Sequence, residues 1–447
     1  MMDGVDAVDL VVVGAGPAGL AAAERATEAG ASVALIDASG ELGGNAAFST
    51  GYLAFAGTSL EREHGIVDSA DLLVADIVAE VERKRADYPR LVFDLAVAER
   101  FAARSGATFE RLRSLGVGFD RFVARPHQHQ VNRTVVMSEP AAFRDVLGAR
   151  LAAAGARLLL RSRVAELTMS AGSVTGVVAE GLAGRTAEIR ARRGVIVATG
   201  GYQASTPMRA RYAPGLDPAS AYPGLDTNRG DGQLMIEKAG GELVNMDMVP
   251  EVVLIASRLV EDCIAVTEDG ERFHDEAGPE RERLRRLRDL GGPGAYYLCD
   301  ARTAAAKAQL VADVPGDRKT FPTLAAVARA IGAPADVLET TVRRWNETVS
   351  SGAATDEFGR VVFPVSGIGI TDPPYTVLPL VVGTNITGGG ARISPDGEVL
   401  GPAARPVPHL FAAGDCNGSI SAANGMGGVH IAAALTLGRV AAERALG

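Results

Sequence analysis

A glycine-rich stretch near the start of the chain constrains the fold more than any other sequence feature. An apolar run, Val11–Val13, leads directly into Gly14, Gly16 and Gly19. The first glycine permits a tight turn, the second lets the backbone approach phosphates, and the third lets a helix pack closely on a strand. The next apolar run ends at Asp37, whose carboxylate can accept hydrogen bonds from ribose hydroxyls. This order predicts a parallel βαβ unit that binds a dinucleotide.

Length and composition narrow the class of protein. A chain of 447 residues, 47% of them hydrophobic, is long enough for two domains with buried sheets. The net charge of −9 argues against a nucleic-acid partner, which requires a basic surface. The three cysteines show no metal-binding or haem-attachment spacing. Neither a signal segment nor an apolar run of membrane-spanning length stands out, so we expect a soluble cytoplasmic protein without a membrane partner.

The hydrophobic patterns predict an α/β chain with an inserted second domain. We expect a first part of the dinucleotide-binding domain over 1–243, the inserted domain over 244–365, and the return to the first domain over 366–447. Helical spacing covers 69–115, 140–155, 280–288, 324–331, 334–350 and 427–446. Strands are expected at 9–13, 33–36, 157–160, 164–169, 174–179, 188–192, 194–198 and 407–415, and the four from 157 to 192 resemble a small meander.

Four glycine-containing segments, far apart in the sequence, are best explained as parts of one cofactor site: 14–19, 43–45, 198–201 and the Gly414-Asp415 pair before the last helix. With the cap-like segment 270–276 and the terminal 423–428, they resemble the FAD-dependent fumarate reductase and succinate dehydrogenase flavoproteins, a superfamily that also holds ketosteroid dehydrogenases, urocanate reductase and tricarballylate dehydrogenase. The resemblance covers essentially the whole chain. It implies a Rossmann-like FAD-binding domain with an inserted α+β capping domain.

The resemblance also implies which residues hold the cofactor. Asp37 would bind the adenosine ribose, Val164 the adenine region, Asp415 the ribityl chain, and the backbone at His430 and Ile431 the flavin pyrimidine oxygen. A helix N-terminus there would stabilise the anion that a reduced flavin becomes. The segment after Gly44 lacks the histidine that attaches FAD in membrane-bound relatives, so FAD is expected to be non-covalent. The remaining expected cofactor contacts are Gly14, Gly16, Ala18, Gly19, Ala38, Gly43, Gly44, Asn45, Ala46, Ser49, Gly51, Ala198, Thr199, Gly200, Asp231, Gly414 and Gly428.

The substrate positions of the fumarate reductases are not reproduced. By the resemblance, a carboxylate-binding histidine corresponds to Asn385 and a second clamping arginine to Gly425, while the acid position falls on Glu280 with Arg281 beside it. A dicarboxylate needs both anionic groups neutralised, because burying an unpaired carboxylate is costly. We therefore exclude fumarate and succinate, and expect Arg133, Asn385, Thr387, Asn424 and Gly425 to contact a different substrate.

Several side chains are candidates for the proton-handling group. His274, Glu280 and Arg281 belong to the inserted domain, whereas His127 and His129 lie on a polar segment that should face the flavin. The two histidines also fit a surface loop, and the alternating charges after Glu280 fit a solvated, salt-bridged helix. The tyrosine role of ketosteroid dehydrogenases is a further alternative, for which the chain offers Tyr202, Tyr222, Tyr297 and Tyr375.

The sequence thus predicts an FAD enzyme that desaturates a C–C bond beside a carbonyl in a small organic molecule, or reduces such a double bond. The alternative is a flavin oxidase or monooxygenase acting at a C–N or C–O bond. A non-catalytic electron carrier would call for a haem, iron–sulfur or membrane segment. Because no second dinucleotide fingerprint follows the first, electrons are expected to exchange with a separate partner such as oxygen, a quinone or a carrier.

Overall fold

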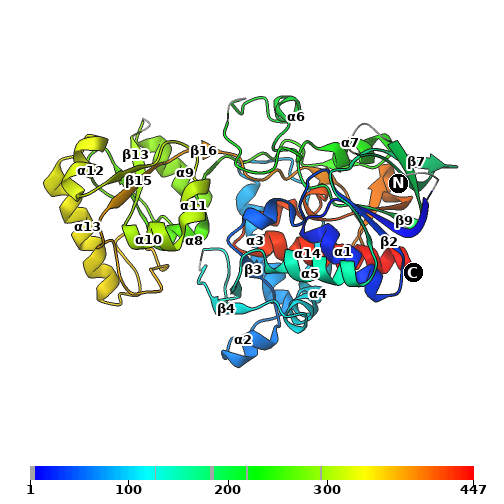
Figure 1. Cartoon of the computed structure of the whole chain (residues 1–447), viewed down its shortest axis with the longest axis horizontal. Coiled ribbons are helices and arrows are strands. Elements are labelled where there is room, and N and C mark those ends of the chain that lie inside the picture. The colour runs from blue at the N-terminus through cyan, green and yellow to red at the C-terminus, as the bar shows by residue number, and fades with distance from the viewer. Residues whose placement is uncertain (1–5, 126, 182–185, 218–219, 292–293) are drawn as a thin grey trace. The chain divides into compact units, whose positions relative to one another are not determined.

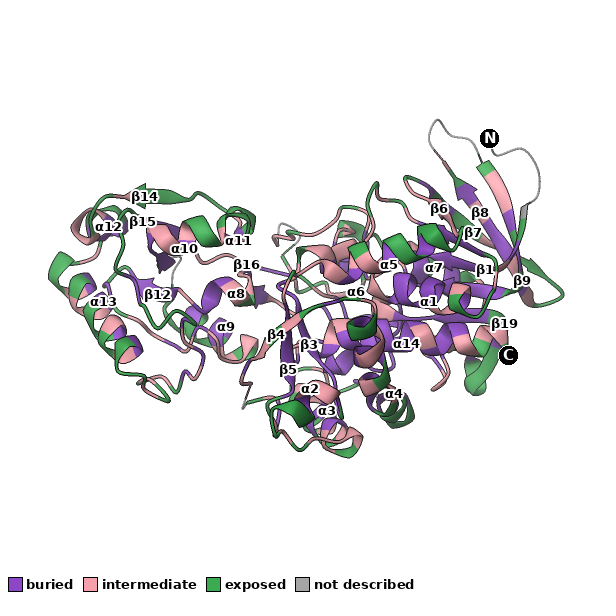
Figure 2. Ribbon diagram, turned by 60° about the horizontal axis from the view of Figure 1, so that its bottom comes forward, coloured by how far each residue is buried: buried purple, intermediate pink, exposed green. Residues whose placement is uncertain are grey.

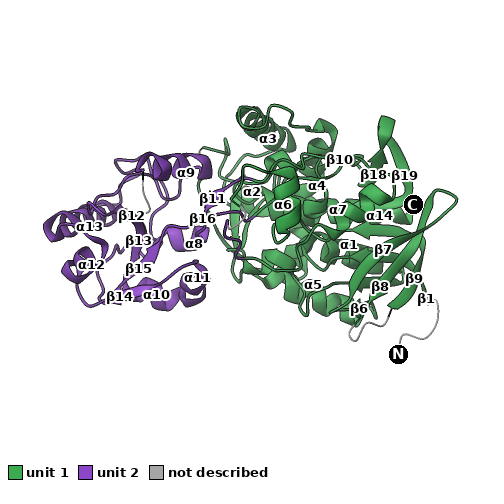
Figure 3. Ribbon diagram, turned by 90° about the horizontal axis from the view of Figure 1, so that it is seen from above, with its two compact units in different colours: residues 1–218, 224–249, 386–447 green, residues 219–223, 250–385 purple. Residues whose placement is uncertain are grey.

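The computed structural model describes residues 6–125, 127–181, 186–217, 220–291 and 294–447. The chain forms two compact units (Figure 3). The first comprises Met1–Pro218, Gly224–Val249 and Ile386–Gly447, and the second comprises Ala219–Pro223 and Pro250–Asn385. The second unit therefore keeps residues 366–385, because strand β15 (Tyr375–Pro379) pairs there with β13 (Ala295–Cys299).

The main sheet of the first unit begins with the expected βαβ unit (Figure 1). Strand β1 (Asp6–Val13) lies parallel to β2 (Val33–Ile36) on one side and to β9 (Thr186–Val197) on the other, and α1 (Pro17–Glu28) connects the first two. The strand order is β18-β19-β9-β1-β2-β6, with β7 and β8 extending from β9. The other strands of this sheet are β6 (Arg157–Leu159), β7 (Arg163–Ser170), β8 (Ser173–Glu180), β18 (Glu398–Gly401) and β19 (Arg405–Ala412).

Two details differ from the sequence-based expectation of a four-strand meander. Strand β6 pairs in parallel with β2, so only β7, β8 and β9 form the antiparallel part. The strands expected at 188–192 and 194–198 are one strand, β9, which continues through Gly194. Gly194 has a φ of +147°, and the register against β1 shifts nearby. A glycine often marks the end of a strand, so the sequence predicted a break at this position. Glycine can also occupy an irregular position within a strand without ending it.

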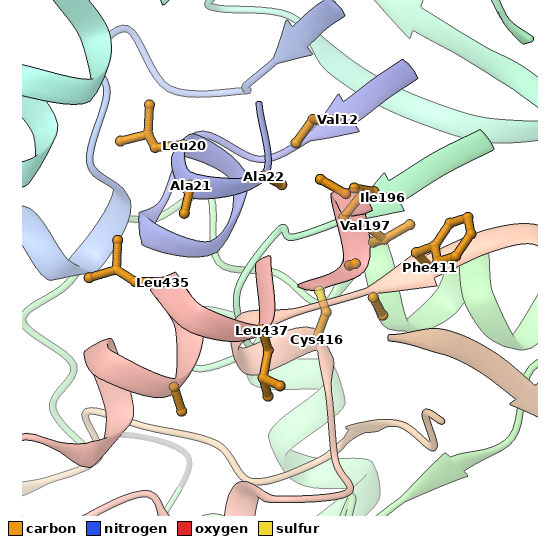
Figure 4. Packing of buried hydrophobic residues seen from close by; sticks show 14 of the residues in the cluster. Val12, Leu20, Ala21, Ala22, Ile196, Val197, Phe411, Cys416, Leu435 and Leu437 are labelled. Carbon is orange, nitrogen blue, oxygen red and sulfur yellow. The ribbon is translucent and has the colours of Figure 1, made fainter. Parts of the chain in front are cut away.

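The core of the first unit packs small side chains of α1 and α14 (Val429–Leu446) against the sheet. Figure 4 shows Ala21 and Ala22 of α1, Leu435 and Leu437 of α14 and the strand residue Val12 as members of one buried cluster. The two helices approach so closely that a Cβ on Gly438 would lie 2.2 Å from a backbone oxygen of α1. Buried residues accordingly run through α1, α14 and the central strands (Figure 2).

Further elements of the first unit flank this core. A three-stranded antiparallel sheet has the order β3-β5-β4, and β10 pairs with β17. These strands are β3 (Tyr52–Ala54), β4 (Phe119–Phe122), β5 (Thr134–Met137), β10 (Leu243–Val244) and β17 (Gly390–Ala391). The α-helices are α2 (Ser59–Glu63), α3 (Ala70–Lys84), α4 (Leu95–Ser114), α5 (Ala142–Ala153), α6 (Thr206–Tyr212) and α7 (Asp231–Lys238). Short 3₁₀ turns are η1 (Gly44–Phe48), η3 (Pro402–Ala404), η4 (Gly414–Cys416) and η5 (Ser421–Ala423).

The second unit is an α+β arrangement around an antiparallel sheet of order β12-β13-β15-β14. Trp345 of α13 is 1% exposed and packs in the core with Leu298 and Val377 of the sheet. The remaining strands are β11 (Val252–Val253), β12 (Ile264–Thr267), β14 (Lys319–Phe321) and β16 (Val382–Gly383). The helices are α8 (Ser257–Val260), α9 (Glu280–Asp289), α10 (Ala301–Ala306), α11 (Ala308–Asp313), α12 (Leu324–Ile331) and α13 (Ala335–Ser350).

Candidate active site

The turn from β1 into α1 is built from glycines with distinct steric roles. Gly14 has a φ of +103°, and a Cβ there would lie 2.2 Å from the carbonyl oxygen of Ala198. A Cβ on Gly19 would lie 1.8 Å from the oxygen of Gly14, so a side chain at this position would push the helix off the strand. These two glycines fix the backbone. Gly16, the N-cap of α1, has no atom within 4 Å of the position of a Cβ and no side chain caps the helix.

A second glycine loop lies against this open helix end. Gly43 donates its backbone N–H to the oxygen of Ala15 at 2.8 Å, and a Cβ on Gly44 would lie 3.0 Å from the Cα of Gly16. Asn45, next in this loop, accepts at its side-chain oxygen from the amide of Leu225 at 2.9 Å. Because unsatisfied amides and the helix dipole favour anions, the open space at Gly16 is suited to phosphate groups.

Asp37 lies where the sequence placed it, directly after β2. Its carboxylate accepts from the backbone N–H of Ala15 at 2.5 Å and from that of Ser39 at 2.7 Å. The acid thus also ties the glycine turn to the neighbouring strand. Asp231, at the start of α7, forms a bidentate ion pair with Arg163, next to the expected adenine contact Val164, at 2.8 and 2.6 Å. This ion pair joins α7 to β7.

Two strand ends of the main sheet come together near these loops. Thr199, after β9, contacts Cys416 after β19, with Oγ1 and Sγ 3.0 Å apart. Gln233 of α7 donates to the carbonyl of Gly200 at 3.0 Å. The side chains of Asp415 and His430 are paired, through Oδ1 and Nε2. These carboxyl ends of parallel strands are where ligands of open α/β sheets bind.

The loop before α14, residues 424–428 and called the α14 loop below, is held by several hydrogen bonds. Gln128 donates to the oxygen of Gly425 at 3.0 Å and accepts from the amide of Gly427 at 2.8 Å. The oxygen of Gly427 accepts from Nε2 of His129 at 2.9 Å and from Thr134 at 3.1 Å. Gly428, with φ +84°, is the N-cap of α14 and accepts from the amide of Ala54 at 2.9 Å. The N-terminus of α14 is therefore fixed in place.

The two histidines expected to face the cofactor have different environments. His127 is exposed, whereas the side chain of His129 is 1% exposed. Next to His129, Arg133 forms buried ion pairs with Asp68 at 2.7 Å and Asp76 at 2.5 Å. Because these carboxylates engage its guanidinium, Arg133 has the contacts of a structural residue. The same holds for His129, which supports the α14 loop.

In the second unit, His274 is a buried neighbour of a charge network. It is 3% exposed, neither ring nitrogen has a hydrogen-bond partner among the described residues, and burial lowers its pKa to about 4. Glu280, at the start of α9, is half-buried and Arg281 is exposed.

The expected substrate contacts near position 385 also differ from one another. Asn385 is exposed in the second unit. Thr387, in the first unit, is fully buried, and its hydroxyl accepts from the amide of Tyr202 at 3.2 Å.

Comparison with known proteins assigns this architecture to a family. The model of the family described as FAD binding domain matches residues 9–431. The chain belongs to this FAD-binding family. Within it, the flavoprotein is similar to a probable fumarate reductase of Shewanella frigidimarina (28% identity over 98% of this chain and 75% of that protein). It is also similar to the urocanate reductase of Eggerthella lenta, with 28% identity over 98% of this chain and 74% of that protein.

Solved structures of related flavoproteins have the same fold. The open conformation of a flavocytochrome c3 fumarate reductase superposes with a TM-score of 0.75 at 27% identity, covering 98% of this chain and 78% of that one. The 3-ketosteroid Δ1-dehydrogenase of Sterolibacterium denitrificans shares the fold, with a TM-score of 0.73 at 21% identity and 99% of both chains covered. The expected fold and superfamily are thus confirmed. By homology, this flavoprotein is an FAD-dependent reductase or dehydrogenase acting on CH–CH groups.

The described residues fit FAD. The open cradle at Gly16, the second glycine loop and the acid at position 37 are all present in the first unit. No helix in the described part of the chain is long and apolar enough to cross a membrane. Lys84 and Arg125 lie against the α14 loop but are not among the site residues expected from the sequence. Arg125 stands two residues before His127, in the segment expected to face the flavin, whereas no motif marks Lys84.

Proposed function

We propose that the flavoprotein catalyses hydride transfer at a C–C bond next to a carbonyl of a small organic substrate other than fumarate or succinate. The observation that carries this proposal is the intact FAD cradle around Gly16 together with the fixed N-terminus of α14. Its relatives include reductases named for fumarate, urocanate, acrylate and vinyl phenol. When bound, FAD supplies the hydride chemistry, and the protein contributes position and electrostatics.

The residues of the first unit then have definite roles. The α1 N-terminus with Gly43 and Gly44 holds the pyrophosphate, and Asp37 holds the adenosine ribose. Asp415, kept in orientation by His430, binds the ribityl chain. The backbone amides at His430 and Ile431 favour negative charge on the adjoining ring, because the first amides of a helix have no partner within it.

FAD is held non-covalently in this proposal. The segment after Gly44 is Asn45-Ala46-Ala47-Phe48-Ser49, which offers no histidine for attachment. Acid precipitation of the purified holoprotein should release all of the flavin into the supernatant. Flavin that stays in the pellet would refute non-covalent binding.

The proton is handled by Arg281 or His274 of the second unit, or by His127. An arginine remains cationic and can donate through its guanidinium, whereas His274, with its pKa lowered to about 4, is neutral near pH 7. Glu280 is a further candidate at the acid position. His129 and Arg133 serve instead to position the α14 loop, through the hydrogen bond to Gly427 and the ion pairs behind it.

Anaerobic flavin spectroscopy tests the reaction class. Chemically reduced holoprotein is mixed with enones, 2-enoates and their amides, and oxidised holoprotein with saturated ketones, acids, amines and alcohols. Rapid reoxidation by an alkene conjugated to a carbonyl, or bleaching by its saturated counterpart, is expected. Bleaching by amines or alcohols alone would overturn the proposal in favour of C–N or C–O chemistry.

The variants Arg281→Ala, Glu280→Gln, His274→Gln and His127→Gln extend the same experiment to the proton. The variant that lacks the proton-handling group should retain FAD but lose the reaction with the active alkene. Full rates in all four would refute this assignment.

A further inference from the structure

Two cationic side chains lie against the loop Asn424–Gly428, which leads into α14. Lys84, the last residue of α3, donates to the oxygen of Asn424, and its Nζ lies 3.4 Å from the position of a Cβ on Gly425. The side chain of Arg125, between β4 and β5, lies 3.2 Å from the position of a Cβ on Gly427. A lysine and an arginine from separate elements thus meet the same short loop.

The structure fixes both cations. Lys84 is at the C-terminal end of α3, where the helix dipole favours positive charge, and its Nζ lies 3.8 Å from Glu80. The Glu80 carboxylate is shared with Arg83, at 2.8 Å. The guanidinium of Arg125 lies over the ring of Tyr52, 5.1 Å from its centroid. Side chains held in this way meet a ligand with little further loss of conformational freedom.

Other residues also hold this loop by hydrogen bonds, so the charge of Lys84 does more than hold the carbonyl of Asn424. Gln128 makes two hydrogen bonds to the loop, and His129 and Thr134 both donate to Gly427. A neutral donor would suffice to hold the single carbonyl of Asn424. A lysine instead places a full positive charge where Gly425 offers no side chain.

We propose that Lys84, assisted by Arg125, binds one carboxylate of the substrate. This inference rests on the proposed function and specifies its substrate class as an organic monocarboxylate. A single cationic anchor of this kind neutralises one anionic group of a ligand. The sequence alone indicated that a cation is missing at position 425; α3 supplies one from a different place in the chain. A charge-assisted hydrogen bond to a carboxylate is about twice as strong as a hydrogen bond between neutral groups.

Ligand binding to the oxidised holoprotein tests the proposal. Acetate, crotonate and cinnamate are titrated against the corresponding amides, and Kd is taken from the perturbation of the flavin spectrum. We expect Lys84→Met to weaken binding of the best acid about tenfold or more. The Kd of the matching amide and the FAD content should stay unchanged, and Lys84→Arg should retain most of the acid affinity. Lys238→Met is the matched control, because Lys238 is exposed and pairs with Glu166.

A chemical readout does not depend on the variants folding. The chain has only four lysines, at 84, 238, 307 and 319, so acetylation by an N-hydroxysuccinimide ester can be followed at each by mass spectrometry. The bound acid should protect Lys84 and leave Lys238 unchanged.

Three results would overturn the proposal: no acid binds, acid and amide weaken equally in Lys84→Met, or Lys84 is acetylated at the same rate with and without acid. Failure of the proposed function looks different. In that case acids would bind and protect Lys84, but no alkene would reoxidise the reduced flavin.

Discussion

Each unit of this flavoprotein buries a network of charged side chains, and the two networks differ in their balance. In the second unit, Arg272 and Arg360 face Glu276 and Asp356, two cations against two anions. In the first unit, a single arginine, Arg133, faces Asp68 and Asp76, and Glu61 adjoins Asp68. The same residue types therefore produce a compensated cluster in one unit and an excess of acid in the other.

The compensated network is a stabilising core. Burial alone would raise the pKa of Glu276, but Arg272 and Arg360 together lower it to about 2. Arg360 directs its remaining donors at four backbone carbonyls and lies 4.4 Å from the ring centroid of Trp345. Every one of these four charges therefore has an opposite partner within ion-pair distance.

The acidic network retains a proton instead. Burial and the neighbouring Asp68 carboxylate together raise the pKa of Glu61 to about 7, against the hydrogen bonds from Thr58 that lower it. Oε1 of Glu61 has no donor in the described part of the structure, as expected for a carboxyl whose proton is shared with a second carboxylate. The ratio of cations to anions, and not burial alone, therefore decides whether a buried charge network titrates near neutrality.

The largest expected effect comes from removing the central anion of the second unit. Glu276→Gln leaves two buried arginines with Asp356 alone, and should lower the free energy of unfolding by about 3–5 kcal/mol. Trp345 is the single tryptophan and contacts both arginines, so its fluorescence reports on this unit during denaturant unfolding of the apoprotein. A loss below about 1 kcal/mol would show that the network is not needed for stability.

A smaller, pH-dependent effect is expected at Glu61. Because its pKa is raised from 4.5 to about 7, the folded state holds more protons than the unfolded state between these values, and stability falls as pH rises through this window. Its contribution is at most about 3 kcal/mol. Glu61→Gln should flatten the stability curve from pH 4.5 to 7, measured by urea unfolding with circular dichroism. Glu63→Gln, on the same helix but exposed, should leave the slope unchanged.

The smallest effect is expected at Glu282, on the solvated face of α9. Hydrogen bonds from Arg285 and Arg286 lower its pKa to about 2, the same value as for Glu276. Its side chain is 45% exposed, so solvent screens these pairs, and Glu282→Gln should cost less than about 1 kcal/mol in the Trp345 assay. A cost equal to that of Glu276→Gln would mean that burial does not set the difference between the networks.

Local sequence patterns predicted much of the fold because their determinants are neighbours in the chain. The turn at Gly14, the helix after Gly16 and the acid at position 37 lie within one βαβ unit, and the structure has all three. The patterns could not show that β9 continues through Gly194 or that β15 completes the sheet of the second unit. Pairing of this kind depends on residues far apart in sequence.

The candidate site likewise has features set by local sequence and features set by long-range packing. Sequence determined that this chain binds a dinucleotide and identified the family, because glycine spacing and an acid at a strand end have steric and hydrogen-bonding consequences that do not depend on the rest of the fold. Only the tertiary structure decided which cations stand beside the α14 loop. In the sequence, Gly425 stands where the resemblance implies a charged side chain. The packing of α3 places Nζ of Lys84 3.4 Å from the position of a Cβ on Gly425. Charge acts through space, so its placement follows from packing and not from order along the chain.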